Sequence, residues 1–196
     1  MNEYQIRAMY DENSITVYQA YSRAIALPAL QNNRFVAPFS FKRMTWIKPS
    51  FLWLMQKSHW GLKPGQEIIL ALHITRQGWE EALSQAVLTS PDPYVYHSYS
   101  EWKEQFETAL VYVQWNPERT IRGKSLAIKS IQVGLSQHIV RNYVNDLMIK
   151  IEDMTPLVRK IYALFQEGLE TKARALLPEE HVYPLDSLLA RRIGIR

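Results

Sequence analysis

Hydrophobic and polar residues alternate along this chain with the short period of strands in some segments and the longer period of helices in others. Residues 4–10 alternate with a period of two, which predicts a strand with one buried face. Residues 67–75 form a nearly continuous apolar run, which indicates a strand at the centre of a sheet. Further strands are expected over 43–47, 110–115, 125–135 and 147–151.

Capping residues and prolines predict helices between these strands. Ser14 precedes residues 15–27, which we expect to be helical and to end before Pro28. A capping box made of Ser98 and Glu101 opens another predicted helix. That helix is expected to extend to about residue 109, and the remaining helices are expected over 49–58, 79–88 and 136–146, and from residue 155 onward.

These elements place the chain in the α+β class, with a mixed, mostly antiparallel sheet flanked by helices and a helical C-terminal end. We expect a single domain over residues 1–196, with a core over about 4–153 and a helical C-terminal extension over about 154–196. Hydrophobic residues make up 47% of the chain, which is enough for a core without disulfide or metal support. No apolar run is long enough to span a bilayer and the first residues show no secretory signal, so we expect a cytoplasmic protein without a membrane partner.

The absence of cysteine removes several classes of site at once. A disulfide framework, a thiolate metal site and a cysteine nucleophile are all excluded. The five histidines are scattered without the spacing of a metal-binding helix, so no metal is expected. Residues 123–125 resemble the end of a phosphate-binding loop, but Glu118 stands where the earlier glycine is required, and the chain has no dinucleotide fingerprint.

The net charge of +4 is distributed unevenly along the chain. No acidic residue lies between Glu12 and Glu67 or between Glu118 and Asp146, although both windows contain several lysines and arginines. Two acid-free windows in one small domain predict a positive surface for an anionic partner such as RNA or DNA. The cations that we expect to contact nucleic acid are Arg34, Lys42, Arg43, Arg119, Arg122 and Lys124.

The first acid-free window is also rich in aromatic residues, including Phe39 and Trp46. Such rings either stack on bases beside cations that bind phosphates, or fill the hydrophobic core. Tyr18 and Tyr21 are expected on one face of the predicted helix. Together with Tyr10 they stack on a planar ligand or pack onto the sheet, and the sequence leaves both interpretations open.

Three further segments carry candidate chemistry, and each also has a purely structural explanation. Arg7, in the first predicted strand, either covers a sheet edge or holds an anion through its planar guanidinium group. Lys48 and Ser50 flank a predicted helix start, where free backbone N–H groups attract anions and where a serine also serves as a cap. Gln114 and Glu118 belong to a polar group at a strand end, which is either a site or a surface turn.

Several of these segments also carry a resemblance to a known family. The strings over 7–11, 43–53, 65–67 and 114–119 resemble the signature blocks of the family called domain of unknown function 4291. The resemblance extends from about residue 4 to residue 153.

A more distant resemblance is to the ADP-ribosyltransferase fold. In that superfamily an arginine or histidine on the first strand, a polar or aromatic residue on a middle strand, and a glutamate near a later strand end form the NAD site. Here Arg7, Thr45 with Trp46, and Glu118 follow that order. Residues 114–118 stand in place of the usual Gln/Glu-x-Glu motif.

The second resemblance implies an NAD-dependent transferase. In such an enzyme Arg7 and Lys48 would neutralise the pyrophosphate of NAD. Glu118, with Gln114 beside it, would stabilise the positive charge that develops on the ribose when the bond to nicotinamide breaks. The implied NAD-binding residues are Arg7, Tyr10, Tyr18, Thr45, Trp46, Lys48 and Ser50.

Three possibilities remain open at this point, and the fold distinguishes the first two. A transferase that consumes NAD and modifies a nucleic acid or another anionic acceptor requires Arg7 and Glu118 to converge on one cleft. A non-catalytic RNA- or DNA-binding module requires an open basic face with exposed Phe39, Trp46 or Trp60. A nuclease, a nucleotide hydrolase or a protein-interaction domain is a third possibility.

Overall fold

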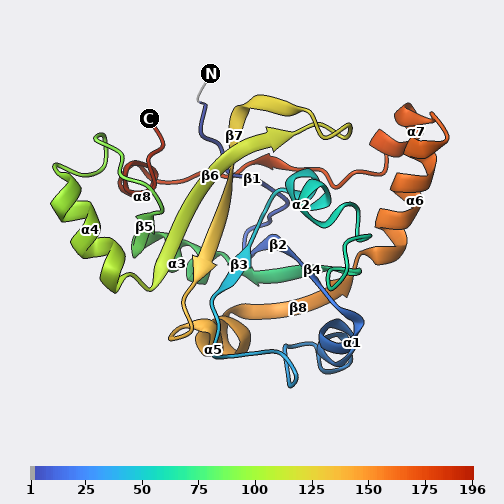
Figure 1. Ribbon diagram of the computed structural model, residues 1–196, viewed down its shortest axis with the longest axis horizontal. Coiled ribbons are helices and arrows are strands. Elements are labelled where there is room, and N and C mark those ends of the chain that lie inside the picture. The colour runs from blue at the N-terminus through green and yellow to red at the C-terminus, as the bar shows by residue number, and fades with distance from the viewer. Residues whose placement is uncertain (1–2) are drawn as a thin grey trace.

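A computed structural model describes residues 3–196, and these residues form nine strands, eight α-helices and one π-helical turn. Figure 1 shows two larger sheets that meet near the middle of the molecule, with helices on both flanks. The Tyr18 N–H donates to the Lys48 carbonyl oxygen over 2.7 Å, and this bridge joins the two sheets. The α+β class, the mixed and mostly antiparallel pairing, and the helical C-terminal end are confirmed.

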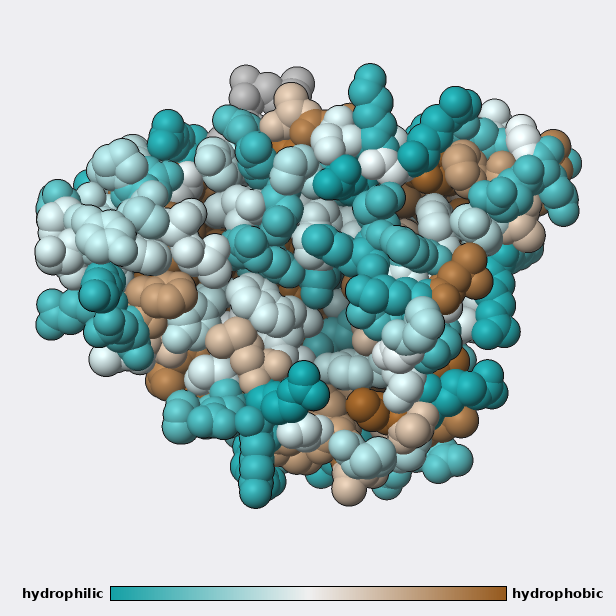
Figure 2. All heavy atoms as spheres, in the orientation of Figure 1, coloured by the Kyte–Doolittle hydropathy of each residue, from teal (hydrophilic) through white to brown (hydrophobic). Residues whose placement is uncertain are grey.

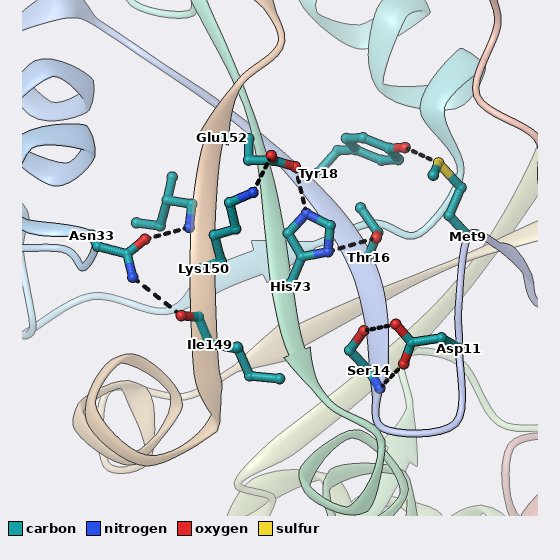
Figure 3. A network of polar contacts seen from close by, with 11 residues as sticks. Met9, Asp11, Ser14, Thr16, Tyr18, Asn33, His73, Ile149, Lys150 and Glu152 are labelled. Carbon is teal, nitrogen blue, oxygen red and sulfur yellow. Dashed lines mark hydrogen bonds and ion pairs between the residues drawn. The ribbon is translucent and has the colours of Figure 1, made fainter.

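The first sheet is antiparallel and has β4 at its centre, as the apolar run predicts. A line of polar side chains crosses this sheet (Figure 3). The Thr16 Oγ1 lies 3.3 Å from the His73 Nδ1, and the His73 Nε2 lies 2.7 Å from the Glu152 Oε2. His73 is therefore a hydrogen-bonded histidine of the sheet, consistent with its place in an apolar strand. The strands are β2 (Ser14–Tyr21), β4 (Ile68–Thr75) and β8 (Met148–Asp153).

The second sheet has the order β3-β7-β6-β5, in which only β5 runs parallel to its neighbour. Its core face is built by Val111, Val113 and Val133, which are fully buried. The opposite face carries polar residues such as Gln114 and Gln132. The strands are β3 (Thr45–Ile47), β5 (Ala86–Leu88), β6 (Val111–Arg119) and β7 (Ser125–Leu135).

Helices cover both sheets and connect their strands. Ser50 caps α2 by accepting the Trp53 N–H over 3.3 Å, and Ser98 caps α4 in the same way. Asn33 ends α1 with a φ of 49°, and its side chain bonds the backbone of β8 at Ile149 and Ile151 (Figure 3). These elements are α1 (Arg23–Asn32), α2 (Phe51–Ser58), α3 (Arg76–Ser84), α4 (Tyr99–Thr108), α5 (Val140–Asn142) and the π-helical η1 (Tyr143–Leu147).

The C-terminal segment begins with two helices and then returns along the molecule to the N-terminal strand. A short strand here pairs with β1. Tyr183 and Ile193 are buried in the same hydrophobic cluster as Ile6 and Val17. The elements are β1 (Arg7–Ala8), α6 (Thr155–Gln166), α7 (Glu170–Arg174), β9 (His181–Val182) and α8 (Ser187–Arg192).

The helix predicted over residues 15–27 is wrong, because this segment is the strand β2 followed by α1. Both faces of β2 are covered, so Ile15 to Gln19 are all buried, and the apolar residues among them do not keep to alternate positions as they do in a strand with one exposed face. Pro28 lies inside α1 and does not follow its end. As a result, Tyr18 and Tyr21 point to opposite faces of a strand and do not share a helical face.

Four other boundaries also differ from the prediction. The strand expected over 4–10 is reduced to β1, with single bridges at Tyr4 and Tyr10. The predicted helix over 79–88 starts at residue 76 and gives way to β5, and β6 continues through Asn116 and Pro117. The helix over 136–146 is only α5 and η1, and Ser136 does not cap it. The polar residues of β9 gave no strand signal.

Candidate functional site

A pocket of about 350 Å³ opens beside α2, where the two sheets meet. Strands β2, β3 and β7, helix α2 and the loop before β4 supply its walls. Figure 2 shows a largely hydrophilic surface over the middle of the molecule, in the area where Figure 1 shows α2, β6 and β7. The polar and charged residues that line the pocket are Gln19, Tyr21, Thr45, Lys48, Lys57, Lys63, Gln66 and Gln132.

Three lysines, Lys48, Lys57 and Lys63, give this pocket its positive charge, and we call it the lysine pocket. The Lys48 and Lys57 Nζ atoms lie 5.3 Å and 5.1 Å from the centre of the Trp53 ring, which is close enough for cation–π attraction. Burial, aided by the positive charge of Lys57, lowers the pKa of Lys48 from 10.5 to about 8. None of the pocket-lining residues is acidic. A bound anion would therefore compensate a charge that the pocket itself leaves uncompensated.

Trp46 offers a flat aromatic surface in the same pocket. Its ring lies against Gly134 of β7, so closely that a Cβ atom at Gly134 would come within 2.9 Å of it. Only glycine allows the indole to lie this near the strand, and Trp46 remains partly exposed to the pocket. Such a surface can stack on a planar ring of a ligand.

The start of β3 supplies hydroxyl and amide groups. The buried Gln19 side chain donates from Nε2 to the Thr45 Oγ1 over 2.7 Å. The Tyr21 hydroxyl lies 3.1 Å from the same Thr45 oxygen. Thr45, predicted from the sequence, therefore lies in the pocket wall together with Tyr21, which the sequence analysis considered for stacking on a planar ligand, and Gln19, which it did not select.

A second polar cluster lies at the N-terminus of α2 and contains carboxyl groups, which the pocket lacks. The Phe51 N–H donates to the Glu180 Oε1 over 2.6 Å, and the Arg7 Nη2 donates to the Glu180 carbonyl oxygen over 2.8 Å. Burial raises the pKa of Glu180 from 4.5 to about 8; the negative charge of Glu118 adds to the increase, while the Phe51 hydrogen bond and the charge of Arg7 oppose it. We call Arg7, Glu118 and Glu180 the carboxyl cluster.

Arg7 and Glu118, selected from distant parts of the sequence, thus lie in one neighbourhood around Glu180. Glu118 is only 6% exposed, and its Oε1 accepts the Arg119 N–H over 2.7 Å. Neither residue lines the lysine pocket. Gln114 is closer to it, because its side chain hydrogen-bonds Gln132 of the pocket wall.

Three residues predicted to bind NAD lie elsewhere. Tyr18 is fully buried against Phe51, and its hydroxyl points to the Met9 sulfur (Figure 3). The Tyr10 hydroxyl donates to the Val182 carbonyl oxygen over 3.1 Å. Ser50 is 1% exposed and caps α2. These contacts support the packing and capping explanations for the three residues.

The six cations predicted to contact nucleic acid lie in two separate places. Arg34, Lys42 and Arg43 are exposed on the loop between α1 and β3. Arg119, Arg122 and Lys124 lie at or near the β6–β7 turn, which Figure 1 shows at the end of the molecule away from α1. Two of the three cations near this turn already form hydrogen bonds or an ion pair with other residues of the chain.

The engaged cations are Arg119, which donates to the Gly123 carbonyl and to Ser125, and Arg122, which forms an ion pair with Glu170 over 2.6 Å. The aromatic residues of the first window are also largely used in packing, since Phe35 and Phe39 are buried and stack on each other at 4.3 Å. Trp46 and Trp60 are partly buried. The open face with exposed rings that a nucleic-acid-binding module requires is therefore poorly developed.

The sequence analysis missed Gln19, Lys57, Gln132 and Glu180. Lys57 had a detectable signal, because it lies in the last turn of the correctly predicted helix over 49–58. The other three depend on strand pairing and on the return of the C-terminal segment, which no local pattern reports. Within residues 3–196 no three histidine or acidic side chains cluster in a way that could hold a metal ion. No helix of this part of the chain has the length and apolar character to cross a membrane.

Comparison with protein-family models gives a match to Domain of unknown function (DUF4291) over residues 5–183. That span contains the lysine pocket and all three residues of the carboxyl cluster. No curated protein matches the chain.

Proposed function

The chain belongs to the domain of unknown function 4291 family, and from the geometry of its pocket we propose that it is an ADP-ribosyltransferase-like enzyme that uses NAD to modify a nucleic acid or another anionic acceptor. The observation that carries the proposal is the pocket lined by Lys48, Lys57 and Lys63 without a carboxylate. A concave site with cations, amides and aromatic surfaces suits a nucleotide.

In this proposal Lys48 and Lys57 bind the pyrophosphate of NAD. Both ammonium groups lie close to the Trp53 ring, at 5.3 Å and 5.1 Å from its centre, and both lysines line the pocket. Charge-assisted hydrogen bonds of this kind contribute about 1.5–3 kcal/mol each. Trp46 stacks on one of the two planar rings.

The reaction breaks the bond between the ribose carbon and the nicotinamide nitrogen, and the bonding electrons leave with nicotinamide. An acceptor atom forms the new bond to the same carbon and releases its proton to solvent. Positive charge builds on the ribose as the first bond breaks, and a carboxylate near it lowers the barrier. Glu118, the carboxylate that the resemblance implies for this role, lies outside the pocket and at the opposite end of β6 from the level of Thr45. We therefore propose it only as a member of the carboxyl cluster with Arg7 and Glu180, and its variant tests whether that cluster takes part in the reaction.

The test follows transfer of label from adenylate-labelled NAD to a mixture of RNA, DNA and protein. The wild-type protein is compared with Lys57→Gln, Glu118→Gln and Lys160→Gln. Lys160 is an exposed lysine of α6 outside the pocket, so it controls for the loss of one positive charge.

We expect label on one class of polymer for the wild type and for Lys160→Gln, and its loss in the other two variants with their melting temperatures retained. Absence of transfer and of NAD hydrolysis in the wild type would overturn the proposal. In that case, binding of RNA or DNA that weakens steeply with salt would favour the non-catalytic module.

A further inference from the structure

A buried hydrogen-bond network lies behind the lysine pocket. Gln19 is its centre: its Nε2 lies 2.7 Å from the Thr45 Oγ1, 3.1 Å from the Tyr21 hydroxyl and 3.1 Å from the Trp46 carbonyl oxygen. The Gln19 Oε1 accepts the Tyr143 hydroxyl over 3.0 Å. Tyr143 is 1% exposed and opens the π-helical turn η1, a rare element that is frequent at functional sites.

The direction of these bonds is fixed by the Trp46 carbonyl. That oxygen only accepts, so the Gln19 atom facing it must be the amide nitrogen. The Gln19 oxygen then faces Tyr143, which has to donate to it. Burial raises the pKa of Tyr143 well above its ordinary value, which keeps this donor protonated.

The network holds one hydrogen more than it has acceptors. The two hydrogens of the Gln19 amide are used by the Trp46 carbonyl and by the closer hydroxyl, that of Thr45. Thr45 and Tyr21 then have two hydroxyl hydrogens and a single contact between them, at 3.1 Å. Among the described residues neither hydroxyl has a further acceptor, and both residues line the pocket.

We propose that this surplus hydroxyl hydrogen, on Tyr21 or Thr45, binds a carbonyl oxygen of the ligand, and that Tyr143 is a positioning residue that acts through Gln19. The inference rests on the proposed function, in which the carboxamide of nicotinamide supplies the oxygen. The assignment also sets the direction of the ligand in the pocket.

The spacing along β3 supports this direction. Thr45 and Lys48 are three residues apart on an extended chain, so their backbone positions are separated by roughly 10 Å. The hydroxyl pair and the lysine pair therefore occupy different ends of the pocket. A neutral amide at one end and a pyrophosphate at the other match these two ends of the wall.

The experiment measures the affinities for NAD and for ADP-ribose, which lacks the nicotinamide, by calorimetry. In either single variant, Tyr21→Phe or Thr45→Val, the remaining hydroxyl still has a hydrogen for the ligand, so we expect at most a threefold loss of NAD affinity. The double variant has none, and we expect roughly a tenfold loss for NAD with ADP-ribose affinity unchanged within twofold.

Tyr143→Phe removes the donor that holds Gln19, and we expect the NAD to ADP-ribose affinity ratio to fall by about threefold to fivefold. Tyr96→Phe is the matched control, because Tyr96 is also buried and bonded through its hydroxyl, to the Leu88 N–H, but lies outside the pocket. Its affinity ratio should equal that of the wild type.

The two proposals fail in different ways. A wild-type protein that binds neither compound overturns the proposed function and the ligand assignment with it. A wild-type protein that binds both, with the same affinity ratio in the double variant, overturns the further inference alone. If Tyr143→Phe does not fold, the double variant decides, since Tyr21 lies at the pocket surface and Val replaces Thr45 with nearly equal volume.

Discussion

The lysine pocket and the carboxyl cluster lie on either side of the same short stretch of chain, yet they treat buried charge in opposite ways. In the pocket, burial and a neighbouring cation lower the pKa of Lys48. In the cluster, burial and a neighbouring carboxylate raise the pKa of Glu180. In the cluster, the Phe51 N–H and the charge of Arg7 compensate the Glu180 carboxylate inside the molecule. In the pocket, no group of opposite charge faces the lysines, which line a cavity that is open to solvent. Internal compensation is typical of structural sites, and external compensation is typical of binding sites.

The two regions also predict opposite pH dependence. Glu180 has a native pKa of about 8 against 4.5 in the unfolded chain, so the native state binds more protons between these values and stability falls as pH rises through them. Lys48 has a native pKa of about 8 against 10.5, so the native state binds fewer protons and stability rises between pH 8 and 10.5.

Removing the positive charge of the pocket is the largest perturbation that we expect for ligand binding. Replacing Lys48 and Lys57 by Met keeps their aliphatic contacts with Trp53 and removes both ammonium groups. We expect roughly a hundredfold loss of affinity for ADP-ribose by calorimetry, with an unchanged or raised melting temperature. Retained affinity would show that the pocket is not the anion site.

Gly134→Ala tests the aromatic wall of the pocket and leaves both charged regions intact. The added methyl group would lie 2.9–3.0 Å from the Trp46 ring, so the indole has to move. We expect a loss of about 1–3 kcal/mol in the free energy of unfolding, measured with urea, together with weaker NAD binding. Gly65→Ala does not serve as a control because of its positive φ. Ala127→Gly, at an exposed position on the same strand, shows the effect of a backbone change alone.

Glu180→Gln removes the titrating group of the carboxyl cluster and keeps an oxygen that can accept the Phe51 N–H. The wild-type unfolding free energy should fall by no more than about 1.4 kcal/mol per pH unit between pH 4.5 and 8, and the variant should lose this part of the slope. Urea unfolding at several pH values measures it. Identical slopes in the two proteins would contradict a raised pKa at Glu180.

The sequence predicts the lysine pocket better than the carboxyl cluster. Thr45, Trp46 and Lys48 lie within four consecutive residues, and the strand and helix on either side of them have clear local signals. The cluster unites Arg7, Glu118 and Glu180, which lie far apart in the sequence, with Arg7 and Glu180 separated by 173 positions. The short pairing of β1 with β9 that brings Glu180 into place has no pattern of its own.

The elements of the fold, like the two regions, were predicted well where the sequence has a clear local pattern and poorly where it does not. Elements with one exposed face, such as α2, α4 and β7, match their predicted ranges closely. β2 was predicted as a helix because its two faces are both buried, so its sequence lacks the alternation by which a strand is recognised. The direction of Gln19, and with it the hydroxyl pair of the pocket, depends on this strand.

The smallest effect that we expect is the change in the pKa of Lys48 caused by Lys57→Gln, and this change compares the two regions most directly. Burial is the main cause of the lowered pKa of Lys48 and the charge of Lys57 is the lesser one, so removing that charge should raise the pKa of Lys48 only part of the way back to 10.5. The pH dependence of Lys48 labelling by an amine-reactive probe, followed by mass spectrometry, measures this change, with Lys160→Gln as the charge-matched control. An unchanged pH profile of Lys48 labelling would mean that burial alone lowers its pKa. The pocket would then lack the interaction between like charges that adds to the effect of burial at Glu180. A raised profile in Lys57→Gln alone would establish that the two ammonium groups interact, as two cations that share one anionic ligand must.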